Sequence, residues 1–370
     1  ARAATGHDRL GRSRPINRPE EPNAAHSLLT TAPDLARFVA AVLASRGLPV
    51  ELRDAMLTPV VAMRGDELAS PRPEELWEKI SWALGWGIQR TGDRALFWHW
   101  GDNGAFRSLL VGDPATGAGL VLLTNSENGL SVAAEIAGPI VGDIHWTTEW
   151  LGYDSYDSPE TAAARDLRRT FVEGSPSAGL ERYHALRKEN PGVDDLEVAL
   201  ETAADLTDLG RIDAALQLLD AARPHHPGSA ELLTRLGTTR VAAGAAAAAV
   251  ASYEQALALA DDDARLSDLL TWTRELAKVQ ADPLTIAPKR LEFLAGSYGP
   301  RRVTREGNEL FYRREGGTRY RLIPVSPDTF ALEGLAGFRI RFVDDENGRP
   351  VKIVGEYAGG ETDETSRSDG

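Results

Sequence analysis

One stretch of the chain, residues 97–108, holds residue types that can take part in acyl transfer: Phe-Trp-His-Trp-Gly-Asp-Asn-Gly-Ala-Phe-Arg-Ser. On a strand, side chains alternate between faces, so His99 and Gly101 share one face and the two tryptophans share the other. The tryptophans can then pack inward while His99 faces a cleft. Gly101 lets a substrate backbone approach the strand, and the N–H of Asp102 can point at a developing oxyanion. The catalytic candidates are therefore His99 and the backbone N–H of Asp102.

Four positions are candidates for substrate binding, namely Trp100, Gly101, Asn103 and His26. The first three flank the Asp102 N–H, and His26 comes just before a predicted helix, where it can border the same cleft. A His-x-Gly sequence by itself also fits an ordinary strand end with a turn glycine. On these residues alone, both interpretations stay open.

The other potentially reactive residues of the chain stand where solvated positions are expected. The chain has no cysteine, which excludes disulfides, thiolate catalysis and cysteine-based zinc sites. His225-His226 stands at a predicted helix end, and Asp261-Asp262-Asp263 lacks the ligand spacing of a calcium loop. The arginines between 301 and 321 lie on predicted strands, where they can meet an acidic partner or remain in solvent. The sequence predicts no metal site and no cofactor.

Length and charge limit the possible classes of protein. At about 100–200 residues per domain, 370 residues predict two or three domains. The net charge is −14 and the basic residues are scattered, which argues against nucleic acid as a partner. No apolar run approaches the roughly 20 residues that a membrane-spanning helix needs.

The elements around residue 99 can be predicted from periodicity. Residues 1–26 are polar and predict a loop. Thr31 and Asp34 form a capping box at the start of a helix, which ends by Gly47. Four short strands then alternate with turns at 84–91, 94–101, 106–112 and 119–125, and helical spacing returns at 130–145 with a kink expected at Gly138-Pro139. Residues 1–151 therefore predict an antiparallel sheet with flanking helices.

The middle of the chain is helical and rich in alanine. Residues 152–161 are predicted to be a linker, and helices follow over 162–282. An offset of 34 residues aligns Gly210 with Gly244 and Ala215 with Ala249. This period is typical of tetratricopeptide repeats, with two of them near 196–229 and 230–263. An irregular helical bundle is the alternative.

The last part of the chain changes to a period of two. Residues 288–358 predict a small antiparallel β-domain, and residues 359–370 are polar and predicted to be disordered. The fold class is therefore α+β: a sheet with flanking helices, then an all-α repeat region, then a small antiparallel β-domain.

Several motifs follow one another in a fixed order along residues 1–150: Thr31-Ala-Pro-Asp-Leu-Ala-Arg-Phe38, Leu84-Gly-Trp-Gly87, His99-Trp-Gly101 and Val121-Leu-Leu-Thr-Asn-Ser126. This order resembles the C-terminal half of the serine beta-lactamase-like and penicillin-binding-protein-like hydrolases, the class C branch. The branch includes D-alanyl-D-alanine carboxypeptidases, D-aminopeptidases and related esterases. Residues 288–358, with Leu294-Ala-Gly-Ser-Tyr298, resemble the β-domain often appended to these hydrolases. The resemblance implies a partial beta-lactamase-like domain over residues 1–151.

The resemblance also implies roles for two residues. Many members have His-x-Gly where others have Lys-Thr-Gly, and His99-Trp100-Gly101 matches that variant. The implied role of His99 is a hydrogen bond to the substrate carboxylate or to the catalytic tyrosine, and the implied role of the Asp102 N–H is one of two oxyanion donors.

The family's other two elements, Ser-x-x-Lys and Tyr-x-Asn, are absent from these residues. No serine stands three residues before any of the five lysines. Tyr153-Asp-Ser155 and Tyr156-Asp-Ser158 fit the family's Tyr-x-Ser variant of the second element, but they lie after His99 in the predicted linker. We therefore expect this chain to be the C-terminal portion of a longer serine hydrolase, and we expect the chain alone to be inactive.

The implied substrate of the longer protein is a D-amino-acid peptide, a β-lactam or a small ester, and the histidine favours a peptidase or an esterase by analogy. One alternative is a non-catalytic interaction protein that holds a protein partner on its helical repeats. Another is a substrate-binding pseudoenzyme. The residues do not fix the compartment, and the resemblance suggests a periplasmic or extracellular location.

Overall fold

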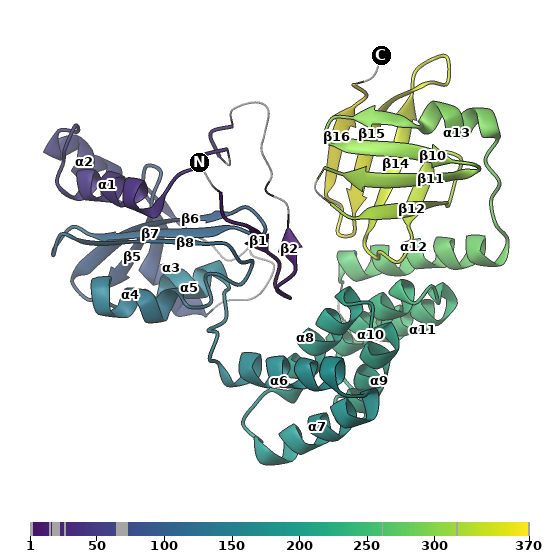
Figure 1. Cartoon of the computed structure of the whole chain (residues 1–370), viewed down its shortest axis with the longest axis horizontal. Coiled ribbons are helices and arrows are strands. Elements are labelled where there is room, and N and C mark those ends of the chain that lie inside the picture. Colours follow the sequence, from purple (N-terminus) through teal and green to yellow (C-terminus); the bar gives the residue numbers. More distant parts are fainter. Residues whose placement is uncertain are drawn as a thin grey trace. The chain divides into compact units, whose positions relative to one another are not determined.

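The structure, a computed structural model, describes residues 3–14, 16, 23–25, 27–63, 73–260, 262–315 and 317–368. The chain divides into two compact units, Ala1–Ser158 and Pro159–Gly370. The first unit combines a sheet with helices, and the second has helices followed by a larger sheet (Figure 1).

The first unit is built on a six-stranded antiparallel sheet in which the strands lie in chain order. They are β3 (Val61–Ala62), β4 (Ile80–Trp82), β5 (Gly87–Thr91), β6 (Arg94–Asp102), β7 (Arg107–Asp113) and β8 (Ala118–Thr124). Gly92 and Gly117 have positive φ in the turns that follow β5 and β7, a backbone conformation that favours glycine. The predicted antiparallel meander over 84–125 is confirmed.

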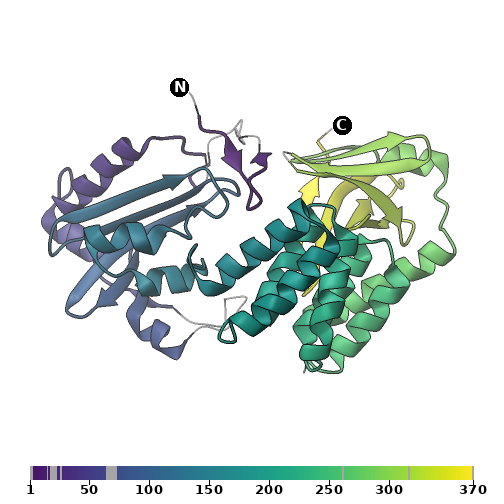
Figure 2. The same ribbon diagram turned by 60° about the horizontal axis from the view of Figure 1, so that its bottom comes forward.

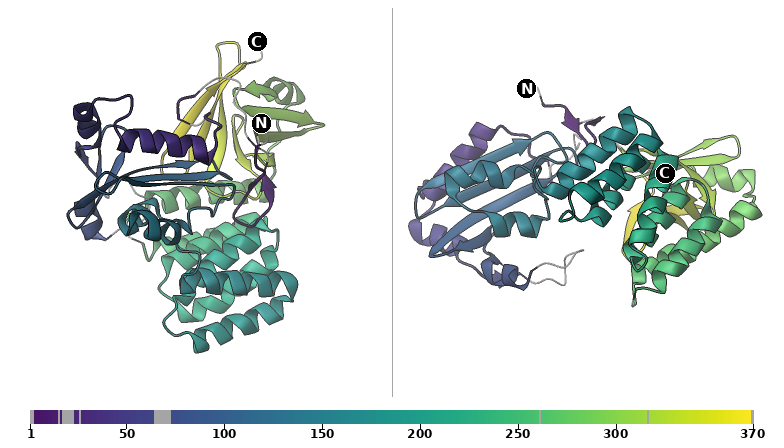
Figure 3. Two further views of the ribbon diagram at one scale, coloured as in Figure 1. Left: turned by 60° about the vertical axis from the view of Figure 1, so that its left-hand side comes forward. Right: turned by 90° about the horizontal axis from the view of Figure 1, so that it is seen from below.

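Helices cover both faces of this sheet, as the left view of Figure 3 shows. On one face, α1 (Ala32–Leu43) packs Val39 and Val42 against Phe97 and Leu110. Three helices lie on the other face, over Trp98, Leu109 and Val111: α3 (Glu74–Lys79), α4 (Ala133–Val141) and α5 (His145–Leu151). Helix α2 spans Val50–Leu57.

Two predictions for the first unit need correction. The helix expected over 130–145 ends earlier, because Gly142 has a φ of 88° and separates α4 from α5; Pro139 lies inside α4. The loop expected over 1–26 contains a short hairpin, β1 (Gly6–His7) and β2 (Ser13–Arg14). The buried Asp8 carboxylate holds this turn by accepting hydrogen bonds from the N–H groups of Leu10 and Arg12, a contribution that hydrophobic periodicity does not detect.

The second unit begins with seven α-helices that pack against one another (Figure 2). They are α6 (Pro159–Glu173), α7 (Pro176–Glu189), α8 (Asp195–Asp208), α9 (Ile212–Ala222), α10 (Ala230–Ala242), α11 (Ala246–Leu257) and α12 (Ala264–Ala281), with a 3₁₀ turn η2 at Arg223–His225. Asp194, Ser229 and Asp263 cap α8, α10 and α12 through their side chains. Helix α6 begins at Pro159, inside the segment predicted to be a linker.

An eight-stranded antiparallel sheet follows the short helix α13 (Pro288–Leu294). Its strands are β9 (Gly296–Tyr298), β10 (Arg301–Glu306), β11 (Glu309–Arg314), β12 (Arg319–Pro324), β13 (Thr329–Leu332), β14 (Phe338–Asp344), β15 (Pro350–Tyr357) and β16 (Thr362–Ser366). One face forms a core that includes Leu310, Leu322 and Phe342. The two ends of the sheet approach each other, because the N–H of Ser368 donates to the carbonyl of Ser297 at 2.9 Å.

The expectation of disorder over 359–370 is wrong for residues 362–366. These residues form β16, which pairs with β15 from Lys352 to Glu356. Asp363 of this strand forms an ion pair with Arg301, whose side chain is buried. Backbone pairing and this ion pair order a segment whose polar composition alone predicts disorder.

Helix α12 packs against the outer face of this sheet, so the two share a core. Leu269 and Leu270 of α12 belong to the same apolar cluster as Ile323 and Ala331 of the sheet. The cavity between α12 and strands β13 and β14 measures about 20 Å³, which is room for about one water molecule. The regions predicted separately at 162–282 and 288–358 therefore pack as one body.

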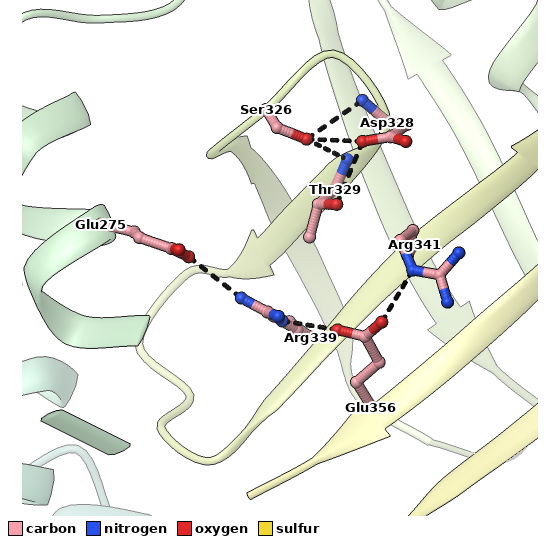
Figure 4. A network of polar contacts seen from close by, with 7 residues as sticks. All are labelled: Glu275, Ser326, Asp328, Thr329, Arg339, Arg341 and Glu356. Carbon is pink, nitrogen blue, oxygen red and sulfur yellow. Dashed lines mark hydrogen bonds and ion pairs between the residues drawn. The ribbon is translucent and has the colours of Figure 1, made fainter. Parts of the chain in front are cut away.

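Polar contacts reinforce this packing (Figure 4). Arg339 of β14 donates to Glu275 of α12 at 3.0 Å and to Glu356 of β15 at 2.7 Å. Its guanidinium also lies 4.4 Å from the ring centroid of Trp272, a cation–π contact. Burial opposes ionisation of Glu356, but the hydrogen bonds from Arg341 and Arg339 outweigh it and lower the pKa of this carboxyl.

Candidate active site

The candidate residues His99 to Asp102 lie at the C-terminal end of β6, which is the longest of the described strands. Along it the side chains alternate as predicted: Leu96 and Trp98 pack towards α3–α5, and Phe97 packs towards α1. Trp98 is fully buried, whereas His99 is exposed. Strand β6 therefore exposes His99 to solvent, and the buried residues on both faces of the sheet fix the backbone that carries it.

The tryptophans form a packed cluster on the face opposite His99. The ring of Trp98 lies 5.3 Å from that of Trp150 and 5.4 Å from that of Trp82, and Trp100 meets Trp150 edge-on at 4.8 Å. Trp100 thus packs against the sheet, and its assignment to substrate binding stays a prediction. Residue 87 must be glycine here, because a Cβ would come within 2.3 Å of the Trp98 ring.

The His99 ring is oriented by its own strand. Its Nδ1 lies 2.8 Å from the carbonyl oxygen of Trp100, and the ring is within 6.4 Å of the Trp86 ring in an edge arrangement. A carbonyl oxygen can only accept, so this bond requires the proton on Nδ1. In the neutral imidazole, Nε2 is then the nitrogen that carries the lone pair and can accept a hydrogen bond.

The main chain of Asp102 points away from β7. The N–H of Asn103 donates to the carbonyl of Phe106 at 3.0 Å, and Asp102 stands opposite Arg107 in the register. In an antiparallel pair the hydrogen-bonded positions alternate, so the N–H of Asp102 faces the side of β6 where β5 lies. Strand β5 pairs with β6 only as far as Trp98. The N–H of Asp102 is therefore directed past the end of β5.

Gly101 makes a close approach that the sequence does not reveal. It stands opposite Ser108 of β7, and a Cβ at this position would lie 2.5 Å from the Ser108 hydroxyl. The prediction was a glycine that admits a substrate backbone. The structure adds a close approach to its cross-strand neighbour.

The turn between β6 and β7 is held by a buried arginine that the sequence analysis missed. Arg107 forms an ion pair with Asp102 and donates to the carbonyl of Glu127 at 3.2 Å. The Asp102 carboxylate also accepts from the N–H of Gly104 at 3.0 Å. These contacts fix the peptide that carries the candidate oxyanion donor. The signal available in the sequence was an arginine three residues after the turn glycine, Gly104.

Tyr153, which the sequence analysis assigned to the linker, lies beside this arginine. Its ring centroid is 5.9 Å from the Arg107 guanidinium, and the side chain packs with the cluster around Trp98. Burial raises the pKa of its phenol, and the positive charge of Arg107 offsets this only in part. Tyr153 is therefore protonated at neutral pH and is not placed as a general base.

The assignments of His26 and Asn103 to substrate binding stay predictions. His26 lies outside the described residues, and Asn103 is exposed in the turn after Asp102. In the helical region, His226 bonds to Asp195 at 3.0 Å. Among the described residues, no group of three or more His, Asp or Glu side chains is arranged to hold a metal ion, and no helix is both long and apolar enough to cross a membrane.

Comparisons with known proteins address the first unit. The family model described as Beta-lactamase matches residues 1–139. This finding supports the resemblance to beta-lactamase-related hydrolases for that part of the chain, while the tetratricopeptide assignment and the appended β-domain stay predictions. No curated protein matches the chain.

One solved structure similar to the chain is the crystal structure of SurE with D-Leu. It is 17% identical over 91% of this chain and 49% of that chain, with a TM-score of 0.20. The chain thus spans about half the length of that structure. A likeness at this level carries no information about function.

Proposed function

We propose that residues 1–158 contribute part of a serine-hydrolase site of the acyl-enzyme type, acting on a D-amino-acid peptide, a β-lactam or an ester. In this proposal the Asp102 N–H is one oxyanion donor and His99 contacts the reacting groups. The Ser-x-x-Lys and Tyr-x-Asn elements that the mechanism needs are not among these 370 residues. The nucleophile would come from a segment outside them, and the chain alone would form no acyl-enzyme.

One observation carries this proposal: the N–H of Asp102 is directed past the end of β5, next to an exposed histidine. An oxyanion hole needs an N–H that is aimed at the reacting oxygen before the reaction begins, because reorienting it during the reaction would cost free energy. The ion pair with Arg107 and the bond from Gly104 hold this peptide in place. The match of residues 1–139 to the beta-lactamase family supports the same reaction type.

The orientation of His99 favours one of its two proposed roles. With the proton on Nδ1, the neutral ring offers Nε2 as an acceptor. An acceptor can take a hydrogen bond from a tyrosine or serine hydroxyl, whereas a substrate carboxylate needs a donor. We therefore assign His99 to orienting a catalytic hydroxyl in the neutral form of the ring.

The test is covalent labelling with a fluorescent penicillin and a fluorophosphonate. The 370-residue chain should remain unlabelled, and a longer protein that includes the Ser-x-x-Lys segment should label. In the longer protein, His99→Ala should lower kcat by about 10²-fold, about 2.7 kcal/mol. His145→Ala, an exposed histidine at the start of α5, is the matched control. Stoichiometric labelling of the chain alone, or unchanged turnover in His99→Ala, would contradict the proposal.

A second function, a protein-binding helical repeat, is supported by a specific observation. The turns after α8 and α10 repeat at a spacing of 34 residues. The N–H of Arg211 donates to Leu206, and the N–H of Ala245 donates to Arg240, at 2.7 and 2.9 Å. Gly210 and Gly244 have φ angles of 72° and 74°. The same turn 34 residues later is expected for two stacked tetratricopeptide-like units.

This second proposal can be tested by removing one period. Deletion of residues 211–244 joins Gly210 to Ala245, two positions that succeed each other in the repeated turn. Circular dichroism should then show retained helicity and a cooperative thermal transition. Deletion of residues 211–240 joins Gly210 to Val241, out of phase, and should abolish the cooperative transition. Equal behaviour of the two deletions would contradict the repeat.

A further inference from the structure

The eight-stranded sheet brings three arginines into one row on its outer face. Arg302 of β10 stands directly opposite Arg313 of β11, and Arg313 stands directly opposite Arg319 of β12. Directly opposite residues of antiparallel strands point to the same face. All three side chains are exposed. Residues that are separated along the chain thus form a continuous cationic row across three strands.

Neighbouring arginines of the same region are occupied by acidic partners. Arg301 points to the opposite, buried face and pairs with Asp363. Arg321 pairs with Glu309 and Glu333. Within the row, Arg319 pairs with Glu306 and lies 3.6 Å from the ring centroid of Phe311.

Arg302 and Arg313 differ from these arginines. In the part of the chain that the structure describes, neither side chain takes part in an ion pair or hydrogen bond. Like charges that stand directly opposite on a sheet destabilise it. We therefore expect repulsion between Arg302 and Arg313 to lower the stability of the free protein, and an anionic partner would relieve this repulsion.

We propose that the row Arg302–Arg313–Arg319 is a docking surface for a carboxylate-rich segment of another polypeptide. Neighbouring strands lie about 4.8 Å apart, close to the spacing of acidic side chains one helical turn apart on a partner. Guanidinium groups bind carboxylates through two parallel hydrogen bonds, which gives the contact a defined geometry. The proposal stands independently of the hydrolase site.

The next row along the strands favours a polypeptide over a simple polyanion. Thr304 of β10 stands opposite Phe311 of β11, and both are half-buried. An aromatic ring and a hydroxyl beside the arginines suit the mixed apolar and polar side chains of a peptide.

The experiment measures binding of a fluorescein-labelled octaglutamate peptide to the whole chain by fluorescence anisotropy at 150 mM salt. Arg302→Gln/Arg313→Gln should weaken binding at least tenfold. Arg90→Gln/Arg349→Gln, which removes two exposed arginines elsewhere, should leave it within twofold. The thermal midpoint of Arg302→Gln/Arg313→Gln without peptide should equal or exceed that of the unsubstituted chain, which confirms that the variant folds.

Four results would overturn the proposal. They are no binding of the peptide at 150 mM salt, equal weakening in the two double variants, tighter binding of polyphosphate than of octaglutamate, and a lower thermal midpoint in Arg302→Gln/Arg313→Gln. The last result would mean that the row stabilises the fold, contrary to the argument from like charges.

Discussion

The two large sheets of this chain are both antiparallel meanders, yet they use their edges and faces differently. The six-stranded sheet carries helices on both faces, and its strand β6 extends beyond β5 by the four residues from His99 to Asp102. The eight-stranded sheet curls until Ser368 bonds to Ser297, and its inner face is filled by its own core.

Because of this difference, the first sheet can offer backbone N–H groups to a ligand, whereas the second sheet can offer side chains. Where a strand continues past its neighbour, backbone N–H groups are available to a ligand, as at Asp102. Where a sheet curls until its ends approach, most of its backbone groups are used by the neighbouring strands, and outward side chains such as Arg302 and Arg313 are available to a partner. An oxyanion site therefore suits the first sheet and a docking surface suits the second.

The largest effect should come from the buried side of β6. Trp98→Ala removes a fully buried indole from the tryptophan cluster and should lower the free energy of unfolding by about 4 kcal/mol. His99→Ala, the adjacent exposed residue, should change it by less than about 0.5 kcal/mol. Urea unfolding followed by circular dichroism checks both values. Similar losses at the two positions would mean that β6 does not separate a structural face from a functional one.

The eight-stranded sheet should depend on its internal ion pair between Arg301 and Asp363. Arg301→Met leaves Asp363 without its buried partner and should cost about 3 kcal/mol. This is the lower end of the range for such pairs, because the Asp363 side chain is 39% exposed and water can solvate it. Arg302→Met, one residue away on the outer face, is the control and should be neutral or slightly stabilising. A neutral Arg301→Met would show that the sheet closes without this ion pair.

A smaller effect is expected where β6 approaches β7. Gly101→Ala places a methyl group 2.5 Å from the Ser108 hydroxyl. Rotation of that side chain can relieve the clash, so the cost should be about 1 kcal/mol. In a Ser108→Ala background the same substitution should cost almost nothing, and a double-mutant cycle measures the coupling. Additive effects would show that Gly101 is required for another reason.

The smallest effect is a dependence of the second unit on pH. The folded pKa of Glu356 is lowered relative to the usual value of 4.5, so its contribution to stability is present above that value and is lost as the pH falls through the lowered pKa. Glu356→Gln should reduce the thermal midpoint at pH 7 and flatten its decline between pH 5 and pH 3. Glu315→Gln, an exposed acid in a turn, should do neither. An unchanged decline in Glu356→Gln would assign the acid sensitivity to other carboxylates.

Local pattern was sufficient to predict strands β5 to β8 and the faces of β6, but it did not predict β3 or β4. Alternation placed Trp98 inward and His99 outward, and turn residues located the hairpins. The capping box at Thr31 and Asp34 located the start of α1, where the Thr31 side chain accepts from the N–H of Asp34.

The missed features depend on residues that are distant in the chain. Arg107 and Tyr153 meet only after the sheet and α5 have formed. Strand β16 is ordered by pairing with β15 and by the contact of Asp363 with Arg301, and neither is visible as hydrophobic periodicity. The arginine row likewise exists only in the register of three strands.

Helix α12 limits the positions at which segments of this protein could be recombined with those of other proteins, during evolution or in the laboratory. Its apolar residues belong at once to the helical stack and to the sheet that begins after residue 295. A chain cut at Asp282 would expose Leu269 and Leu270 to water, and the sheet transplanted alone would expose Ile323 and Ala331. The smallest unit that could be transferred intact is therefore the whole of residues 159–368. A recombination junction that preserves folding is expected near residue 158 rather than near residue 285.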